Sequence, residues 1–250
     1  MIKSTIASFL LGIISAHENF NLTIRKHEIP ASETMNIVHL SDIHYPKQGV
    51  SLKSILFQTK QCDPTIICIT GDLMDDSLKE MDQSLYDFLS HLKDIAPVLY
   101  VRGNHEVRID KLINIEKKMF ELGIINLNGN HHSYGQVSFY GIDELNRYQI
   151  LDCNKEHFNV VLAHHPEDVY RLQEGFGIDI MLSGHAHGGQ IRIGNHGLFA
   201  PGQGILPRYT KGLWQIHDRM RLNISAGIGM SSFKQRINNR PEIVLIRLKG

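Results

Sequence analysis

The sequence predicts a mixed α/β (α+β) fold in which two sheets pack as a sandwich and helices flank them. Short apolar runs rich in Ile and Val recur along the 250 residues, and runs of this length are typical of buried strands. Helical patterns separate the early runs, whereas the last third of the chain has short strand patterns around glycine-rich turns. Together these observations predict two packed sheets in one domain.

The apolar runs mark the expected strands, at residues 36–40, 65–70, 98–101, 159–163, 178–182 and 242–248. A helix is expected over residues 77–95, because its apolar side chains share one face: Leu78, Met81, Leu85, Phe88, Leu89 and Leu92. A second helix is expected over 110–122, with Gly123 at its end. A third is expected from Pro166 to the glycine at 175, with proline in its first turn.

The last third of the chain predicts hairpins or irregular strands over residues 190–199 and 213–227. The stretch from Gly197 to Trp214 contains two prolines and four glycines. It predicts a long loop near the functional site, which either holds a lipid or shapes a pocket, or packs its own side chains on the core.

Composition limits the function classes. Apolar residues make up 42% of the chain, which is enough for a sizeable core. The 26 basic and 26 acidic residues give no net charge, so no nucleic-acid partner is expected; only Lys234, Arg236 and Arg240 suggest a basic patch. The 3 cysteines include no CxxC pair, which argues against a disulfide framework or a zinc knuckle, and Cys68 is expected in the core.

Residues 1–18 form a short apolar segment, and residues 19–250 are expected to form a single domain. The apolar stretch from Thr5 to Ser15 is shorter than the roughly 20 residues of a transmembrane helix. It is consistent with a signal-like segment, a remnant anchor, an amphipathic helix in contact with a membrane surface, or a helix packed on the domain. The expected location is cytoplasmic or peripheral at the membrane, with export as an open alternative.

Five strand-like runs are followed directly by residue types that bind metals. These residues are Asp42 and His44; Asp72 and Asp75; Asn104, His105 and Glu106; His164 and His165; and His185 and His187. Loops at the carboxyl ends of strands form the functional site in α/β folds. The first three sets are about one strand–helix–strand unit (~30 residues) apart, so adjacent parallel strands would bring them together.

Carboxylate, imidazole and amide ligands suit a divalent ion such as Mn²⁺, Fe²⁺ or Zn²⁺. The ligands are too many for one ion, and two ions about 3.5–4 Å apart would use them all. A pair of divalent ions at this distance is typical of enzymes that catalyse phosphoryl transfer. Each motif alone also fits an ordinary turn, but five such motifs in order, each after an apolar run, favour a metal centre.

The motifs "SDIH", "GDLMD", "GNHE", "AHHPE" and "SGHAHGG" resemble, in this order, those of the calcineurin-like metallophosphoesterases. The later stretches "GGQIRI", "APGQGILPRYTKGLW" and "RPEIVLIRL" are similar to a bacterial branch of membrane-associated or exported phosphodiesterases. The resemblance implies a metallophosphoesterase-like, four-layer fold: a two-sheet β-sandwich flanked by helices.

The resemblance also implies roles for single residues. Asp42, His44 and His187 would bind one metal; Asn104, His164 and His185 would bind the other; and Asp72 would bridge them. His105 would be the general acid that protonates the leaving oxygen, and Asp75 would orient a ligand. His164 is favoured over the adjacent His165 because the ligand in the family pattern directly follows the strand; His165 would then face outward.

The leading hypothesis is a two-metal phosphoesterase that hydrolyses phosphodiester or pyrophosphate bonds by in-line attack of a metal-bridging hydroxide. A lipid-linked nucleotide pyrophosphatase and a cyclic-nucleotide phosphodiesterase are alternative enzymes, and a catalytically silent binding or scaffold module of the same fold is an alternative of another class. The expected partner is a small phosphate ester or a lipid-linked substrate, with membrane-surface contact through residues 1–18. Arg102 and His165 are candidate substrate contacts. The oligomeric state is left open.

The two histidines of the "GHAHGG" motif are one residue apart. On an extended backbone this spacing would point His185 and His187 the same way, one to each metal. The surrounding glycines would let the turn approach the ions closely.

Overall fold

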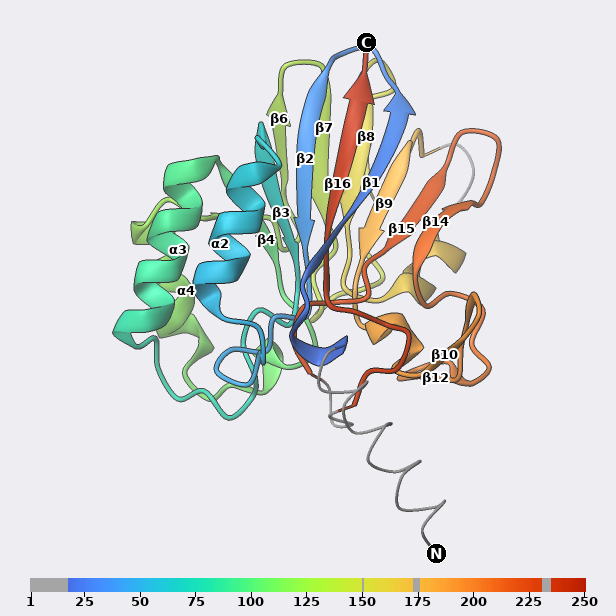
Figure 1. The fold of residues 1–250 in the computed structure, drawn as a ribbon. Helices are drawn as coiled ribbons and strands as arrows, with labels where there is room; N and C mark the ends of the chain where they lie inside the picture. Colours follow the sequence, from blue (N-terminus) through green and yellow to red (C-terminus); the bar gives the residue numbers. More distant parts are fainter. Residues whose placement is uncertain (1–17, 150, 173–175, 231–234) are drawn as a thin grey trace, which may run out of the picture.

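The computed structural model describes residues 18–149, 151–172, 176–230 and 235–250. Two six-stranded sheets pack against each other, as the sequence predicts (Figure 1). The first sheet has the strand order β1-β16-β2-β3-β4-β5, and the second has the order β14-β15-β9-β8-β7-β6. Residues 1–17, which contain most of the segment expected to contact a membrane, lie outside the described residues.

The first sheet brings together strands from both ends of the described chain. Its strands are β1 (Thr23–Pro30), β2 (Met35–Leu40), β3 (Ile66–Thr70), β4 (Val98–Val101), β5 (Ile125–Asn126) and β16 (Glu242–Lys249). Neighbouring strands β2, β3 and β4 are parallel, so their carboxyl ends meet at one edge of the sheet. The last strand, β16, lies between β1 and β2.

The second sheet contains the other strands that lead to the predicted site. Its strands are β6 (His131–Tyr134), β7 (Val137–Gly141), β8 (Phe158–Leu162), β9 (Ile180–Ser183), β14 (Gly212–Gln215) and β15 (Arg221–Ile224). β8 and β9 are parallel, and β14 and β15 form the predicted antiparallel hairpin. Two short antiparallel pairs precede it: β10 (Arg192–Ile193) with β11 (His196–Gly197), and β12 (Phe199–Ala200) with β13 (Gly204–Ile205).

Three α-helices cover the outer face of the first sheet (Figure 1): α2 (Leu52–Gln61), α3 (Gln83–Ile95) and α4 (Leu112–Glu121). α3 starts six residues later than predicted, because the Asp82 carboxylate caps it by accepting the N–H of Leu85 at 2.9 Å. The helix expected after Pro166 is a single 3₁₀ turn, η2 (Pro166–Tyr170). Its predicted end, residues 173–175, lies outside the described residues.

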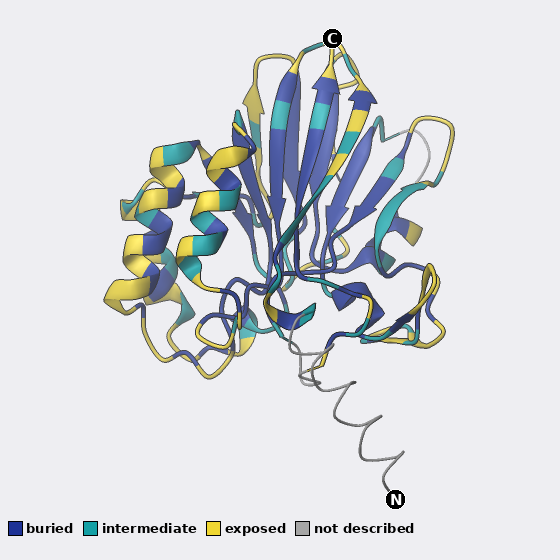
Figure 2. Cartoon of the chain, in the orientation of Figure 1, coloured by how far each residue is buried: buried dark blue, intermediate teal, exposed yellow. Residues whose placement is uncertain are grey.

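Alternate residues of the central strands enter different hydrophobic clusters, which explains their continuous apolar runs. In β2, Val38 packs under the helices and Ile37 packs between the sheets. In β9, Met181 joins a third cluster on the outer face of the second sheet, with residues from η2 and the loops. Figure 2 shows the strands as the buried centre and the helices with one exposed side.

The loops that follow β2, β3, β4, β8 and β9 gather at one end of the sandwich, the lower end in Figure 1. The described chain enters the fold at the same end. Glu18 Oε2 accepts the backbone N–H of Asn239, and Asn19 Oδ1 accepts that of Arg236. Within the described ranges, no helix has the length and apolar character that crossing a membrane requires.

Candidate metal centre

One group of predicted ligands comes from the loops after β2 and β9. His187 Nε2 lies 3.4 Å from Asp42 Oδ1 and 3.1 Å from His44 Nε2. The three side chains are buried, and their donor atoms lie within 4.8 Å of one another. Asp42, His44 and His187 are thus brought together as the sequence predicts.

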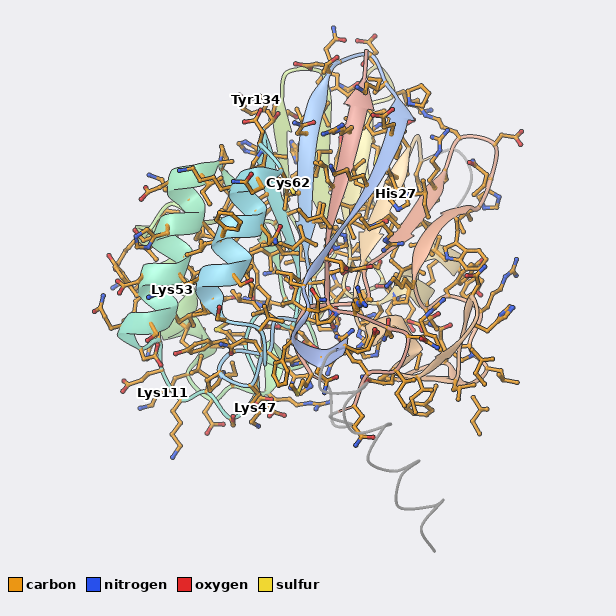
Figure 3. The ribbon with its side chains drawn as sticks, viewed as in Figure 1. His27, Lys47, Lys53, Cys62, Lys111 and Tyr134 are labelled. Carbon is orange, nitrogen blue, oxygen red and sulfur yellow. The ribbon has the colours of Figure 1, made fainter. Side chains whose placement is uncertain are left out.

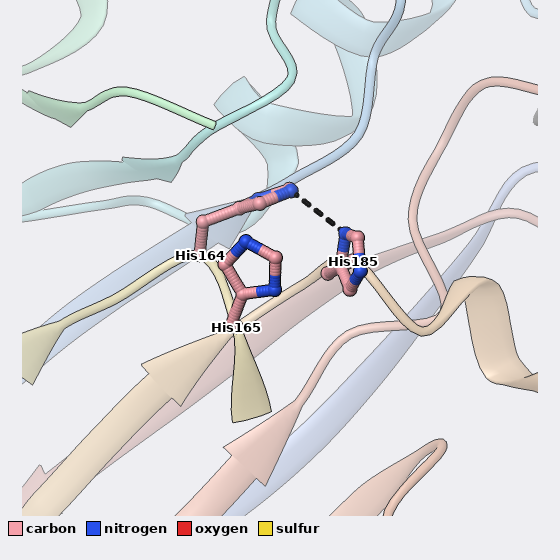
Figure 4. Close-up of side chains that lie close together, drawn as sticks. All are labelled: His164, His165 and His185. Carbon is pink, nitrogen blue, oxygen red and sulfur yellow. Dashed lines mark hydrogen bonds between the residues drawn. The ribbon is translucent and has the colours of Figure 1, made fainter. Parts of the chain in front are cut away.

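A second group forms around His164, at the carboxyl end of β8. Its Nε2 lies 3.0 Å from Asn104 Oδ1 and 3.2 Å from His185 Nδ1 (Figure 4). Its Nδ1 lies 2.9 Å from the carbonyl oxygen of Thr70. A proton on Nδ1 satisfies that carbonyl and leaves the lone pair of Nε2 directed at the group, which is the arrangement of metal-binding histidines.

Asp72 lies between the two groups. Its Oδ2 is 3.3 Å from His164 Nε2 and 3.7 Å from His44 Nε2, while its Oδ1 accepts the backbone N–H of His105 at 2.9 Å. One carboxylate oxygen therefore faces an imidazole of each group, as a bridging ligand must.

The backbone around the centre is strained. Five predicted ligands have positive φ angles between 45° and 64°: Asp42, His44, Asp72, His185 and His187. Such conformations are costly outside glycine and cluster at functional sites. The expectation of an extended backbone at 185–187 is therefore wrong, although each histidine still reaches a different group. Glycine at 184 lets the loop approach Asp42 closely, because a Cβ there would lie 2.3 Å from Asp42 Oδ2.

Glu106 is a residue of the site whose role the sequence did not reveal. Its fully buried carboxylate accepts three backbone N–H groups, those of Asp72 at 2.9 Å, Gly103 at 2.8 Å and Met74 at 2.7 Å. These bonds fix the loops after β3 and β4 relative to each other. The "GNHE" motif contains Glu106, but its partners are backbone groups, and side-chain spacing does not predict those.

Asn239 and Arg236 secure the loops on the other side of the centre, and the sequence did not indicate this either. Asn239 Nδ2 donates to the carbonyl oxygen of His187 at 2.7 Å. The guanidinium of Arg236 is buried and donates to the carbonyl oxygens of Ala226 at 2.8 Å and Gly229 at 2.6 Å. Arg236 therefore cannot contribute to an exposed basic patch, and Lys234 lies outside the described residues.

His105 lies beside the first group, and its side chain is 23% exposed. Its ring meets that of His44 edge-on, with 4.7 Å between centroids. Asp75 lies 3.9 Å from His105 Nδ1 and binds Lys47 at 2.6 Å; Figure 3 labels Lys47 at the lower end. Burial alone would raise the pKa of Asp75, but Lys47 and Ser77 outweigh it and lower this pKa to about 2.

His165 does not face outward, contrary to the expectation. Its ring is 4.0 Å from that of His185 between centroids, and its Nε2 lies 2.9 Å from Glu144 Oε1 (Figure 4). Arg102 points away from the ligand groups: it forms two hydrogen bonds of 2.7 Å with Glu116 and lies 3.4 Å from Asp143. The structure thus places His165 beside the second group, and Arg102 against α4 and the loop after β7.

The electrostatics of the site favour a bound cation. Burial raises the pKa of Asp42 to about 6, and burial lowers the pKa of His44 to about 4 and that of His185 to about 2. Burial alone would lower the pKa of His164, but the carboxylates of Asp72 and Asp42 raise it to about 10. His44 and His185 are therefore neutral near pH 7, which is the protonation state in which an imidazole binds a metal, whereas the carboxylates draw a proton to His164 that a bound cation would displace.

The residues fit a divalent metal. The Nε2 atoms of His44 and His187 face each other at 3.1 Å, and the buried Nδ1 atoms of both rings have no hydrogen-bond partner within the described chain. Carboxylate, imidazole and amide groups converge there, and this donor set suits Mn²⁺, Fe²⁺ or Zn²⁺. The residues of the centre can therefore hold divalent cations.

Comparisons with known proteins agree with this geometry. A model of the calcineurin-like phosphoesterase family (Metallophos) matches residues 35–189, more than half of the chain. The uncharacterized metallophosphoesterase YkoQ of Bacillus subtilis (strain 168) is 31% identical over 237 residues, which cover 88% of this chain and 85% of that protein. A transmembrane protein with metallophosphoesterase domain from Bos taurus is 25% identical over 271 residues, covering 96% of this chain and 60% of that protein.

Solved structures show the same fold. The crystal structure of TT1561 of Thermus thermophilus has a TM-score of 0.52 at 12% sequence identity, covering 78% of this chain and 91% of that one. The fold, the gathered ligands and the match of the family model lead to one conclusion. The chain belongs to the calcineurin-like phosphoesterase family.

Proposed function

We propose that the protein is a two-metal phosphoesterase that hydrolyses phosphodiester or pyrophosphate bonds. The position of Asp72 carries this proposal, because one of its oxygens faces His164 at 3.3 Å and His44 at 3.7 Å. Residues 19–250 act as one domain in this proposal, since each of the two sheets supplies part of the centre.

Seven side chains would hold the two ions. Asp42, His44 and His187 form the first ligand set, Asn104, His164 and His185 form the second, and Asp72 is common to both. When bound, two divalent ions lower the pKa of a water and stabilise charge on the phosphate oxygens. The distances in both groups, and the direction of His164 Nε2 fixed by Thr70, support this assignment over His165.

His105 is proposed as the general acid. Its partly exposed ring lies against that of His44, next to the first ligand set, and its backbone N–H is fixed by Asp72. Nδ1 lies 3.7 Å from Asp76 and 3.9 Å from Asp75, so these carboxylates can orient the ring. A proton on this ring can pass to the leaving oxygen.

The expected substrate is a phosphodiester or a pyrophosphate, either a nucleotide or a lipid-linked molecule. If the substrate is lipid-linked, we expect residues 1–18 to contact a membrane surface. A silent binding module of the same fold is the alternative of another class. It is disfavoured because all seven ligand positions and His105 carry metal-binding or acid–base side chains, and such a module has no need to keep them.

The first experiment measures metal content of the purified protein by mass spectrometry, together with hydrolysis of bis(p-nitrophenyl) phosphate with and without added Mn²⁺. The proposal expects about two metals per chain and metal-dependent turnover. If the protein contained no metal and showed no turnover with Mn²⁺, Fe²⁺ or Zn²⁺, the silent binding module would be favoured over the phosphoesterase.

The acid role of His105 has its own test. His105→Ala should keep its metal and lose about 10²–10⁴-fold in turnover with a poor leaving group, and lose much less with p-nitrophenolate, which needs no proton. His91→Ala is a matched control, because this exposed histidine of α3 lies away from the site. Full activity of His105→Ala on the poor leaving group would refute the acid role.

A further inference from the structure

We propose that the loops of β10–β13 dock the protein on an anionic lipid bilayer, with the metal centre facing the lipid headgroups. The orientation of the centre rests on the proposed function, whereas the docking itself does not. The docking surface is defined by four side chains, Ile193, Phe199, Ile205 and Leu206.

These side chains are strongly exposed for apolar residues. Ile205 is 82% exposed, Leu206 68%, Ile193 67% and Phe199 52%, all within a stretch of fourteen residues. A pocket of about 330 Å³ next to them is lined by Gly189, Gln190, Ile191, Leu198 and Phe199. Apolar side chains gathered on two short hairpins and the residue after them, beside an apolar pocket, mark an interaction surface rather than scattered exposure.

The docking surface borders the second ligand group. A Cβ on Gly202, in the turn between β12 and β13, would lie 3.8 Å from His185 Nε2 and 3.6 Å from Glu167 Oε1. The same turn is fixed to the core, since Gln203 accepts the N–H of Tyr209 at 3.0 Å and donates to its carbonyl oxygen at 2.6 Å. A lipid surface bound by these side chains would therefore lie close to His185 of the second ligand group.

The charge of this region suits an anionic membrane. No aspartate or glutamate occurs between Asp179 and Asp218, so the whole stretch that carries the surface is free of acidic side chains. Arg208, which follows Leu206 and Pro207, is exposed. This surface has exposed apolar side chains and an adjacent arginine, and the stretch that carries it contains no acidic residue. Such a surface is attracted to a negatively charged leaflet and not repelled by it.

The point where the described chain begins adds to the argument. Glu18 accepts the N–H of Asn239, and Asn239 donates to the carbonyl oxygen of His187, so the chain enters beside the metal centre. Phe20 is 57% exposed there. Residues 1–17 have an apolar sequence with one lysine and no acidic residue. The described chain thus begins at the same end of the molecule as the docking surface (Figure 1).

The test is sedimentation of the full chain with vesicles of equal parts phosphatidylglycerol and phosphatidylcholine. The double variant Ile205→Asp/Leu206→Asp should bind these vesicles at least tenfold more weakly than the natural chain, because two charges replace inserted apolar groups. The matched control is Ile113→Asp/Phe120→Asp on α4, whose side chains are 79% and 76% exposed on another side of the molecule. The control should bind like the natural chain.

Folding is checked by thermal unfolding, and the single variant Ile205→Asp provides a milder change with a smaller loss. Metal-dependent hydrolysis without vesicles should be unchanged in all variants, so an inactive natural chain would contradict the proposed function and leave the docking result intact. Three results would overturn the docking proposal: no vesicle binding by the natural chain, equal binding by the double variant, or a dimer in solution that the double variant dissociates.

Discussion

The two sheets supply different chemistry to the same centre. Loops of the first sheet provide both carboxylates, Asp42 and Asp72, and the amide of Asn104, with one imidazole. Loops of the second sheet provide only imidazoles, those of His164, His185 and His187. The two carboxylates thus come from the first-sheet side alone, and only a correct packing of the sheets brings them beside the three imidazoles of the second.

The sheets also hold their loops by different means. On the first sheet, the buried carboxylate of Glu106 binds three backbone N–H groups. Near the second sheet, Asn239 and Arg236 donate to backbone carbonyls. Glu106 fixes three backbone N–H groups and the Asn239 amide binds two carbonyl oxygens, so substitution of Glu106 should have the larger effect of these two.

Asp72→Ala should have the largest effect, because Asp72 serves both ligand sets. We expect loss of metal and loss of activity together, with turnover reduced by more than about 10³-fold. Metal content and hydrolysis of bis(p-nitrophenyl) phosphate are measured on the same sample. Asp87→Ala, on the exposed face of α3, is the control. Retention of both metals in Asp72→Ala would break the assignment of a shared ligand.

Glu106→Gln should have the second-largest effect on the candidate metal centre. The glutamine has nearly the same size, but its amide nitrogen would face a backbone N–H that now donates to the carboxylate. We expect metal affinity to fall about 10–100-fold, as for other residues that orient ligands. Titration with Mn²⁺ measures this, with Glu121→Gln at the exposed end of α4 as the control. A lower melting temperature with unchanged affinity would make Glu106 a purely structural residue.

Asn239→Ala removes two neutral hydrogen bonds, those to the carbonyl oxygens of His187 at 2.7 Å and Gln190 at 3.3 Å. Each such bond corresponds to about a two- to tenfold loss in affinity. The same Mn²⁺ titration compares it directly with Glu106→Gln, and Asn114→Ala on the exposed side of α4 is the control. A loss larger than that of Glu106→Gln would reverse the ranking of the two sides.

The last prediction concerns stability and not activity, at the contact between the two sheets. His39 on β2 bonds Thr70 Oγ1 at 2.7 Å and lies 3.0 Å from Asn223 on β15. Burial lowers the pKa of His39 from 6.5 to about 3. Below pH 6.5 the unfolded chain therefore gains a proton that the folded chain does not, and the free energy of unfolding falls by about 1.4 kcal/mol per pH unit towards pH 3.

His39→Gln should remove this part of the pH dependence. Urea unfolding at pH 6.5, 5.5 and 5.0, values chosen inside the window, measures the slope for the natural chain, for His39→Gln and for the exposed-site control His91→Gln. Equal slopes for the natural chain and His39→Gln would show that His39 takes up its proton in the folded state.

The sequence was most informative where side chains decide the structure. Buried strands such as β3 are marked by apolar runs, and the ligands stand directly after them. The backbone conformation was harder to predict from the sequence. The prediction of an extended conformation at His185 and His187 was wrong, since both residues have positive φ angles that side-chain spacing does not reveal. β1, with the sequence TIRKHEIP, has no apolar run, since it is an edge strand that pairs with β16 from the far end of the chain.

Helix α2 escaped prediction for a related reason. Only Ile55 and Thr59 of its ten residues are buried, so the apolar pattern is weak, and the Ser51 cap is the clearer signal. Glu106 and Asn239 could not be assigned because each binds backbone groups brought close by tertiary structure. Such partners have no characteristic spacing along the chain.

The position of β16 between β1 and β2 has a consequence for biosynthesis. β16 is made after every other described strand, yet β1 and β2, which precede the others, must flank it. Until β16 has been made, β1 and β2 have no partner in that place, and the loop that carries Asp42 and His44 extends from an incomplete sheet. The candidate metal centre can therefore mature only after the eight residues of β16 have been made and have paired with both strands.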